Sequence, residues 1–312
     1  MEQASSNPNN PQQFIEGSFS SNIMKLNYSN LRNQACRVIG SEGQEPGQFD
    51  FPRDIVVDSS TNHLIVSEWH NNRVQVLGDD GSFIRFIGNG RGNELNQIGF
   101  PWGLALSDGG RLFVCDNGNK RIQSWQLSDG SYLGLFQVDF KPHCVAIGPS
   151  GDQLFVSLYS NKIQVIGMDG QPIRSIGMGQ GSLHGQLNYP VGLAFNSHGD
   201  LLVGDSWNKR ISVFEASSGE FVTNFGQFSG GNLNLSIDSF DRVIVSDSGS
   251  HRLEFFDGGF QSIGQFGSWG NEIGQFFYPN GVRIDEQNGR LIVCDYGNHR
   301  LQIINGAATL VC

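Results

Sequence analysis

The sequence has 312 residues, includes 42 glycines, and carries a formal net charge of −10. This acidic balance weighs against general binding to polyanions, so we expect neither DNA nor a membrane surface as a partner. No apolar run approaches the roughly 18 residues that a membrane-spanning helix needs.

The first 34 residues divide into two segments by composition. Residues 1–13 are almost entirely Asn, Pro, Gln and Ser, which cannot bury enough apolar surface to order themselves, so we predict a disordered polar tail. Residues 14–34 contain scattered apolar side chains such as Phe14 and Ile23. This segment is ambiguous: it could pack on the outside of the following domain or begin a partner-binding segment.

From residue 35 to residue 312 the chain repeats a short signature, in which an acid is followed by two residues, Asn, one residue and Arg. Its copies run from Glu68 to Arg73, Asp116 to Arg121, Asp205 to Arg210, Asp247 to Arg252, and Asp295 to Arg300. Ser250 replaces the Asn in one copy, and a sixth copy, at 158–162, has lost the acid. With the basic residue as marker, the copies fall at 73, 121, 162, 210, 252 and 300. A period of forty-odd residues indicates a solenoid or a propeller.

Each repeat has the pattern of a four-stranded antiparallel sheet. In the last repeat, β-branched runs at 281–285 and 290–294 flank a turn at 286–289, and the signature and a third strand follow. Fourth strands are visible in earlier repeats, at 82–87 and 220–225. We therefore predict an all-β, six-bladed β-propeller that forms one domain over 35–312.

The closing strand of the propeller has two candidates. Residues 36–40 resemble a fourth strand that precedes the first blade, and could complete the sixth blade from the N-terminal side. The alternative is 308–312, which follows the strong hairpin turn Asn305-Gly306. We favour closure by the N-terminal strand.

The connections between fourth and first strands are long and glycine-rich before blades one, two, four and six, and short before blades three and five. In an antiparallel blade these connections lie at the same end as the signature turns. We call this end the loop face.

The five cysteines stand at 36, 115, 144, 294 and 312, and none form a C-x-x-C pair. Without a disulfide framework or a signal peptide, the sequence favours a reducing, cytoplasmic location. Cys115 and Cys294 occupy the same register and are expected to be buried small side chains.

Residues 36–312 resemble an NHL-repeat six-bladed propeller, the type found in tripartite-motif NHL proteins. The resemblance rests on Gly274-Gln275-Phe276, then Tyr278-Pro279-Asn280-Gly281, then Asp295 with Asn298-His299-Arg300. The resemblance implies a propeller platform, a fold that proteins of many unrelated activities share. Some propellers of this class bind single-stranded RNA on the loop face, and the family often joins its propeller to a ubiquitin ligase module. This chain lacks the zinc-binding Cys and His pairs of such a module, so a role in ubiquitination would be that of a recognition subunit.

The acid and the base of each signature are expected to form an ion pair that braces the hairpin. A structural role explains why these residues recur in nearly every blade, whereas catalytic residues rarely do.

The variable positions of the loop face carry the candidate binding residues, which are aromatic and basic. They are Trp69, Trp102, Tyr159, Trp207, Trp269 and Tyr296, with Lys120, Lys209, His251 and His299 between them. Exposed aromatic rings beside cations are typical of binding hot spots. The alternative is that each ring caps the strands of a neighbouring blade and is mostly buried.

An enzyme would need metal ligands or acid–base groups at the channel mouth. Asp54, His143 and Asn280 are weak candidates for such a set, by analogy with peptide-amidating lyase and lactonase propellers. One histidine is a poor metal site, and we expect neither a metal nor a cofactor.

The prediction is therefore a non-catalytic platform that binds a protein or peptide through its loop face. Single-stranded RNA on the same face is the alternative. A metal-dependent lyase or lactonase-like enzyme is the second alternative.

Overall fold

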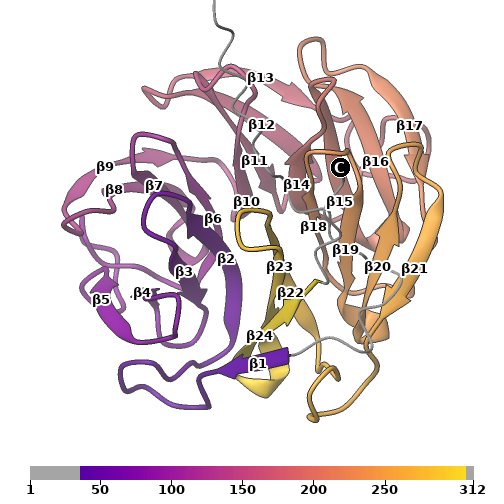
Figure 1. Cartoon of the computed structure of the whole chain (residues 1–312). Coiled ribbons are helices and arrows are strands. Elements are labelled where there is room, and N and C mark those ends of the chain that lie inside the picture. The colour runs from indigo at the N-terminus through magenta and orange to yellow at the C-terminus, as the bar shows by residue number, and fades with distance from the viewer. Residues whose placement is uncertain (1–35, 307–312) are drawn as a thin grey trace, which may run out of the picture.

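The computed structural model describes residues 36–306, which fold into six four-stranded antiparallel sheets arranged around a central channel (Figure 1). This confirms the prediction of an all-β, six-bladed propeller. The predictions for 1–13, 14–34 and 308–312 lie outside the described residues.

The blades, numbered I to VI in chain order, each place their first strand at the channel and their fourth strand outermost. Blade I consists of β2 (Pro52–Asp58), β3 (His63–Glu68), β4 (Arg73–Leu77) and β5 (Phe83–Ile87), and blade II of β6 (Pro101–Leu106), β7 (Arg111–Asp116), β8 (Arg121–Gln126) and β9 (Tyr132–Gln137). Blade III consists of β10 (Pro142–Ile147), β11 (Gln153–Leu158), β12 (Lys162–Gly167) and β13 (Pro172–Ile176), and blade IV of β14 (Pro190–Phe195), β15 (Asp200–Asp205), β16 (Arg210–Glu215) and β17 (Phe221–Phe225). Blade V consists of β18 (Leu233–Ile237), β19 (Val243–Asp247), β20 (Arg252–Phe256) and β21 (Ser262–Phe266), and blade VI of β22 (Pro279–Asp285), β23 (Arg290–Asp295), β24 (Arg300–Asn305) and the N-terminal β1 (Cys36–Ile39). Short 3-10 turns follow the second strand in four of these blades: η2 (Asn117–Asn119), η3 (Ser206–Asn208), η4 (Ser248–Ser250) and η5 (Tyr296–Asn298).

Strand β1 closes the propeller by pairing antiparallel with β24, from Cys36 opposite Ile304 to Ile39 opposite Leu301. Ile39 is buried in a cluster that joins blades VI and I. The N-terminal strand thus covers the edge that β24 would otherwise expose, as predicted.

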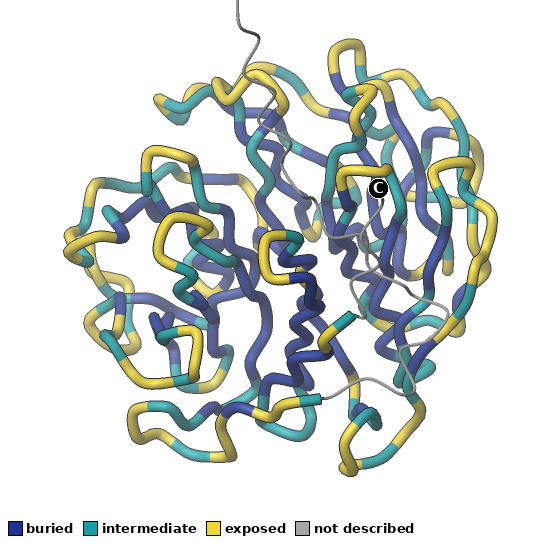
Figure 2. Tube along the Cα trace, viewed as in Figure 1, coloured by how far each residue is buried: buried dark blue, intermediate teal, exposed yellow. Residues whose placement is uncertain are grey.

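The hydrophobic core lies between blades. Five of the six buried clusters draw their side chains from two neighbouring blades, and the cluster between blades II and III also includes Val191 of blade IV. The inner strands are the most buried parts of the chain (Figure 2). Burial of apolar surface stabilises by about 25 cal/mol per Å². Because these clusters hold each blade to its neighbours, they provide a rigid frame for the loops.

The blades alternate in character around the propeller. Where the first strand meets the channel, blades I, III and V carry Asp54, Cys144 and Asn234, whereas blades II, IV and VI carry glycine. A Cβ added at Gly103 would lie 2.6 Å from the Cα of Cys144, so the close approach of the two strands requires glycine. The propeller is therefore built as three pairs of blades.

The four cysteines in the described range are free, and three of them are buried, including Cys115 and Cys294. Within the same range, no helix is long and apolar enough to cross a membrane.

Candidate binding face

Each signature turn ends in a residue with a left-handed backbone, immediately before the Arg or Lys. These residues are Asn72, Lys120, Asn161, Lys209, His251 and His299, with φ between 53° and 60°. Left-handed geometry orients each side chain from its turn toward the next blade.

Four of these six side chains accept a hydrogen bond from the blade that follows. Their ring nitrogens or amide oxygens bind the backbone N–H of an aromatic residue that is itself left-handed and precedes a proline. The pairs are Asn72 with Phe100 (3.0 Å), Asn161 with Tyr189 (2.7 Å), His251 with Tyr278 (3.1 Å) and His299 with Phe51 (3.3 Å). All four lie before a long connection.

Lys120 and Lys209 stand at the same position before the two short connections, and both are exposed. The two histidines act as hydrogen-bond acceptors at this position, since Nδ1 of His251 and of His299 each faces a backbone N–H. Burial also lowers the pKa of His251, an effect that Asp247 and Asp295 partly offset.

The signature ion pairs form in four blades, where the acid is fully buried. Arg Nε lies 2.6 to 2.8 Å from the carboxylate in Glu68–Arg73, Asp116–Arg121, Asp205–Arg210 and Asp295–Arg300. The same arginines donate to backbone carbonyls of the long connections; Arg121, for example, binds the carbonyls of Asn93, Glu94 and Gln97 at 2.7 to 2.9 Å. Each of these arginines therefore braces its hairpin and clamps the connection before its own blade.

Blade V departs from this arrangement. Arg252 pairs with Glu254 at 2.7 Å, and Asp247 instead accepts hydrogen bonds from Ser229 and Ser250. The expected Asp247–Arg252 ion pair is not made, because the short connection before blade V places Ser229 beside the carboxylate.

A layer of buried polar and aromatic side chains closes the channel at the loop face. The guanidinium of Arg53 lies 3.6 Å from the Trp102 ring centroid and 5.1 Å from that of Tyr296. Trp102 stacks on His143 with ring centroids 4.5 Å apart, and His143 contacts Tyr189 at 4.7 Å. We call this layer the plug.

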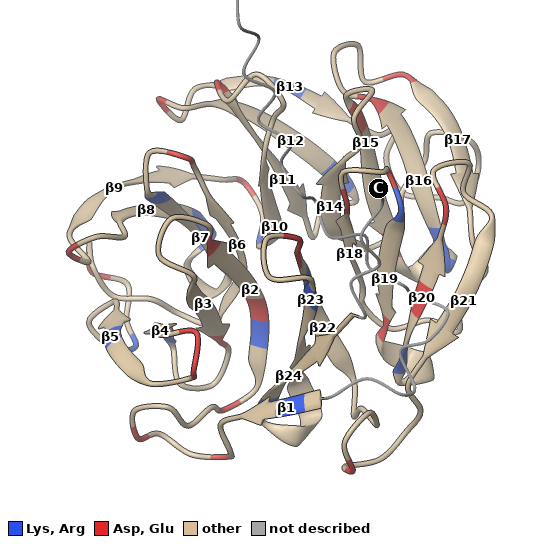
Figure 3. Ribbon diagram, in the orientation of Figure 1, with Lys and Arg blue, Asp and Glu red and all other residues tan. Residues whose placement is uncertain are grey.

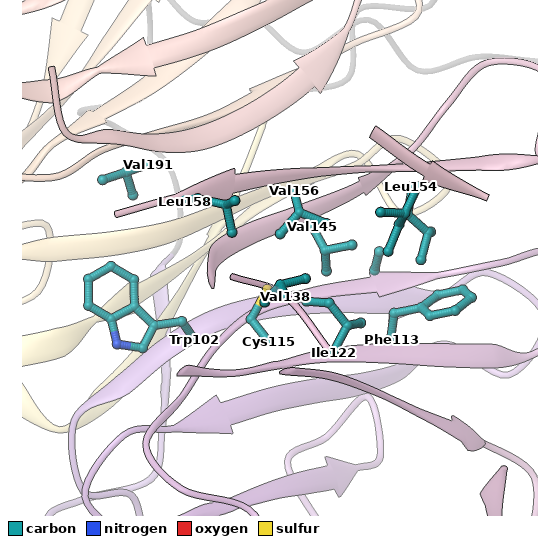
Figure 4. Close-up of a cluster of buried hydrophobic side chains, with 12 residues drawn as sticks. Trp102, Phe113, Cys115, Ile122, Val138, Val145, Leu154, Val156, Leu158 and Val191 are labelled. Atoms are coloured by element: carbon teal, nitrogen blue, oxygen red, sulfur yellow. The ribbon is translucent and has the colours of Figure 1, made fainter. Parts of the chain in front are cut away.

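Trp102 is therefore not an exposed binding residue. It is only 9% exposed and lies at one end of the cluster between blades II and III (Figure 4). The residue after the proline points to the channel axis, so its side chain packs in the plug instead of standing on the surface.

The three weak metal candidates do not form one site. Asp54 accepts hydrogen bonds from the backbone N–H groups of Ile55 (2.9 Å) and Leu104 (2.8 Å), and burial raises its pKa to about 6. Nδ1 of His143 donates to the carbonyl of Pro190 at 2.9 Å, and burial lowers its pKa to about 4. Across 36–306, no group of three or more His, Cys, Asp or Glu is arranged to hold a metal ion.

Three of the predicted aromatic residues are exposed: Tyr159 (53%), Trp207 (58%) and Trp269 (67%). Trp207 stacks almost parallel on Tyr189, with centroids 4.9 Å apart, and Tyr159 meets Tyr189 edge-on at 5.7 Å. Tyr189 in turn contacts the plug, so the exposed rings rest on a rigid base. Trp69 and Tyr296 are only partly exposed.

The tips of the long connections add exposed apolar residues that our sequence reasoning missed. They are Leu95, Met178, Leu183 and Ile273, each more than 60% exposed. The available signal was the presence of large apolar side chains within glycine-rich connections. Together with Trp269 they form an apolar rim outside the central aromatic group.

The exposed charges of the loop face are of both signs, and charged residues are spread over the molecule without a continuous basic stripe (Figure 3). The exposed acids are Glu42, Glu45, Glu94, Asp139 and Glu272, and the exposed cations are Arg91, Lys120, Lys141, Lys162 and Lys209. This arrangement does not favour a polyphosphate backbone.

Comparisons with known proteins agree with this geometry. A family model described as "NHL repeat" matches residues 49–77, 99–124, 187–214 and 276–304. These segments are in blades I, II, IV and VI, the four blades that have a long connection and the Arg clamp.

Two relatives are "NHL repeat-containing protein 3" from Homo sapiens, 31% identical over 153 residues (45% of this chain and 43% of the relative), and from Mus musculus, 32% identical over 139 residues (41% and 40%). The matched part thus spans less than half the length of these relatives. "Protein brain tumor" from Drosophila melanogaster is 28% identical over 115 residues, 34% of this chain and 10% of that protein.

Among solved structures, a streptogramin B lyase aligns with a TM-score of 0.63 at 12% identity, covering 88% of this chain and 99% of the lyase. A Kuenenia stuttgartiensis hydrazine synthase aligns with a TM-score of 0.61 at 13% identity, covering 86% and 99%. At such identities the likeness shows the fold alone.

Proposed function

Because this chain carries NHL repeats and folds as a six-bladed β-propeller, we propose that it is a non-catalytic platform whose loop face binds a protein or peptide. The observation that carries the proposal is the group formed by Tyr159, Tyr189 and Trp207, in which two exposed rings rest on a fixed third. Exposed rings that are already ordered lose little conformational entropy on binding, which is typical of anchor residues.

The chemistry of the face favours a polypeptide over single-stranded RNA. The rings and the rim offer apolar contact area, whereas the glutamates of the long connections would repel phosphates. A peptide with apolar or aromatic side chains would bury its anchors between the central group and the rim.

The proposal includes the cytoplasm as the location, and recognition of a client in a ubiquitin-related pathway as one setting for such a platform.

The test is selection of random 16-residue peptides on phage against the purified full chain, followed by affinity measurement of the selected peptides and of a fluorescent 20-nucleotide RNA. Trp207→Ala and Trp269→Ala should each weaken peptide binding at least tenfold. The control is Phe240→Ala, which removes an exposed ring from the turn between β18 and β19, at the opposite face.

All three substitutions remove an exposed side chain, so we expect changes in unfolding free energy of less than about 1 kcal/mol. Peptides that bind the three variants and the wild type equally would refute the proposal. Salt-sensitive RNA binding without any selected peptide would identify the face as a base-stacking surface.

A further inference from the structure

All four lysines of residues 36–306 lie on the loop face. Lys120 and Lys209 are in the signature turns of blades II and IV, Lys141 directly precedes β10, and Lys162 begins β12. All four are exposed, and none forms an ion pair with a carboxylate in that part of the chain. The lysines therefore provide positive charge that the fold itself does not use.

Lys162 is unpaired because the signature of blade III is degraded. In the other five blades the basic residue is an arginine, which binds an acid of its own blade. In blade III the position of the acid holds Leu158, which is opposite Lys162 in the pairing of β11 with β12. The connection before this blade, at 138–141, is also one of the two short ones, so Lys162 has no long connection to clamp.

Lys120 and Lys141 lie close to Lys162 on the same part of the face. The N–H of Tyr159, which is three residues before Lys162, donates to the carbonyl of Lys141 at 3.0 Å. Lys120 is joined to the short connection, because its carbonyl accepts a hydrogen bond from that segment at 3.1 Å. Two exposed rings stand among the lysines, Tyr159 and Phe140. We call the three lysines and these two rings the lysine sector.

The lysine sector continues into the aromatic group that carries the proposed function. Tyr159 belongs to both, and contacts Tyr189, on which Trp207 stacks. The signature turn that holds Trp207 is bound to the long connection before blade IV, where Met178 and Leu183 are exposed. Positive charge, aromatic rings and apolar side chains thus follow one another from blade III to blade IV.

The exposed acids of the loop face lie mostly elsewhere. Glu42, Glu45, Glu94 and Glu272 belong to the long connections before blades I, II and VI, and the connection before blade IV, at 177–189, contains no acid. Asp139 is the exposed acid within the sector, against three lysines. The loop face is therefore electrostatically two-sided, with its positive side over blades III and IV, and it would orient a charged partner.

We propose that the peptide bound by the loop face carries an acidic stretch beside its apolar anchor residues, and that this acidic stretch binds the lysine sector. The inference rests on the platform proposed above and names the class of its partner. The anchors would lie against Trp207 and the apolar connection before blade IV, and the carboxylates would lie over blade III.

Such a peptide fits these features better than an RNA strand does. An RNA strand carries a phosphate at every nucleotide, so beyond the sector its phosphates would meet Glu94 on the blade II side or apolar side chains on the blade IV side. A peptide can place carboxylates at the lysines and apolar side chains at the connection. The lysine ammonium is a compact charge on a flexible stem, so it pairs with a carboxylate without a fixed geometry.

The probes are 16-residue peptides selected on phage from a random library against the purified full chain. The selected peptides should be enriched in Asp and Glu relative to the unselected library. The triple variant Lys120→Gln/Lys141→Gln/Lys162→Gln should bind the tightest of them about tenfold more weakly at low ionic strength, because three exposed ion pairs are lost together. Added salt should reduce this difference, since it screens exposed charges.

A matched control changes the net charge by the same three units on the opposite face. It is Gln171→Glu/Gln261→Glu/Gln287→Glu, which alters three exposed glutamines in turns at that face and should bind the peptide as the wild type does. A second peptide, in which Asn and Gln replace Asp and Glu, should bind the wild type and the lysine variant equally. The lysine variant should keep the thermal unfolding midpoint of the wild type, because its lysines have no partner to lose.

Selected peptides that need Trp207 but show no acidic enrichment, or that bind the lysine variant as they bind the wild type, would overturn this inference and leave the platform standing. A clear fall in the unfolding midpoint of the lysine variant would assign the lysines a structural role, and would also overturn it. If no peptide is selected and a fluorescent 20-nucleotide RNA binds the wild type but not the lysine variant, the sector is a phosphate site. That result would overturn both the platform and this inference.

Discussion

Nδ1 of His299, in the last blade, accepts a hydrogen bond from the backbone N–H of Phe51, before the first blade; the two nitrogens are 3.3 Å apart. This bond crosses the seam at which the propeller closes. It is the same bond that Asn72 makes to Phe100 and Asn161 makes to Tyr189. The seam is therefore joined on the loop face as the other long-connection junctions are.

Replacement of His299 tests this junction. His299→Ala should lower the unfolding free energy by about 2 kcal/mol, since it leaves the Phe51 N–H without its acceptor. It also puts alanine, which cannot form the side-chain hydrogen bond, in a left-handed backbone conformation. His299→Asn should retain most of the stability, because Asn serves at this position in blades I and III. Chemical denaturation of the two variants makes the comparison, and an equal loss in both would contradict the acceptor role.

Because the signature arginines clamp the long connections, we expect two Arg→Lys substitutions to differ widely in their effect on the unfolding free energy. Arg121→Lys should cost at least about 2 kcal/mol, since lysine cannot bind Asp116 and three carbonyls together. Arg252→Lys should cost less than about 1 kcal/mol, since Arg252 pairs only with Glu254 and is partly exposed. Hydrogen exchange in residues 88–100 should rise in the Arg121 variant alone.

The buried His143 predicts loss of stability in acid. Its pKa is lowered to about 4 in the folded chain, so between pH 6.5 and 4 the unfolded chain takes up a proton that the folded chain does not. The contribution of His143 is thus fully present above pH 6.5 and is lost as the pH falls toward 4. Between pH 7 and pH 4.5, the wild type should lose about 2 kcal/mol more than His143→Gln.

The comparison with the variant is needed because the titration of Asp54 changes the unfolding free energy with pH in the opposite direction. Burial raises its pKa to about 6, so its contribution is present below about pH 4 and is lost as the pH rises through 6. Parallel curves of unfolding free energy against pH for the wild type and His143→Gln would refute the prediction for His143.

The closing strand predicts different outcomes for two truncations. Removal of residues 1–40 deletes β1, which pairs with β24 and buries Ile39, and should cost about 3 kcal/mol or more. Removal of 1–35 keeps β1 and serves as the matched control, and removal of 1–13 should likewise leave stability unchanged. If all three truncations unfold at the same denaturant concentration, β1 does not stabilise the propeller.

The fold could be predicted because each blade repeats local information. The signature turn and the short β-branched strands recur in every blade, and glycine-rich connections precede four of the six. A repeated pattern is reliable even where one copy, at 158–162, is degraded. The closing strand followed from the same logic, since residues 36–40 resemble a fourth strand.

The site could be predicted only in part, because exposure depends on where a neighbouring blade lies. Trp102 and Trp207 are both loop-face tryptophans in the sequence, yet the first is packed against Arg53 and His143 and the second stands on Tyr189 in solvent. Nothing local to either residue distinguishes them.

What the sequence by itself determined is the architecture: six blades, their strands, their long and short connections and the strand that closes them. What only the tertiary structure decided is which side chains remain available. The packing of one blade on the next placed His251 and His299 as hydrogen-bond acceptors, and Arg252 pairs with Glu254 instead of Asp247. Those outcomes depend on distances between neighbouring blades, whose equivalent residues are far apart in the chain. A local sequence pattern carries no information about such distances.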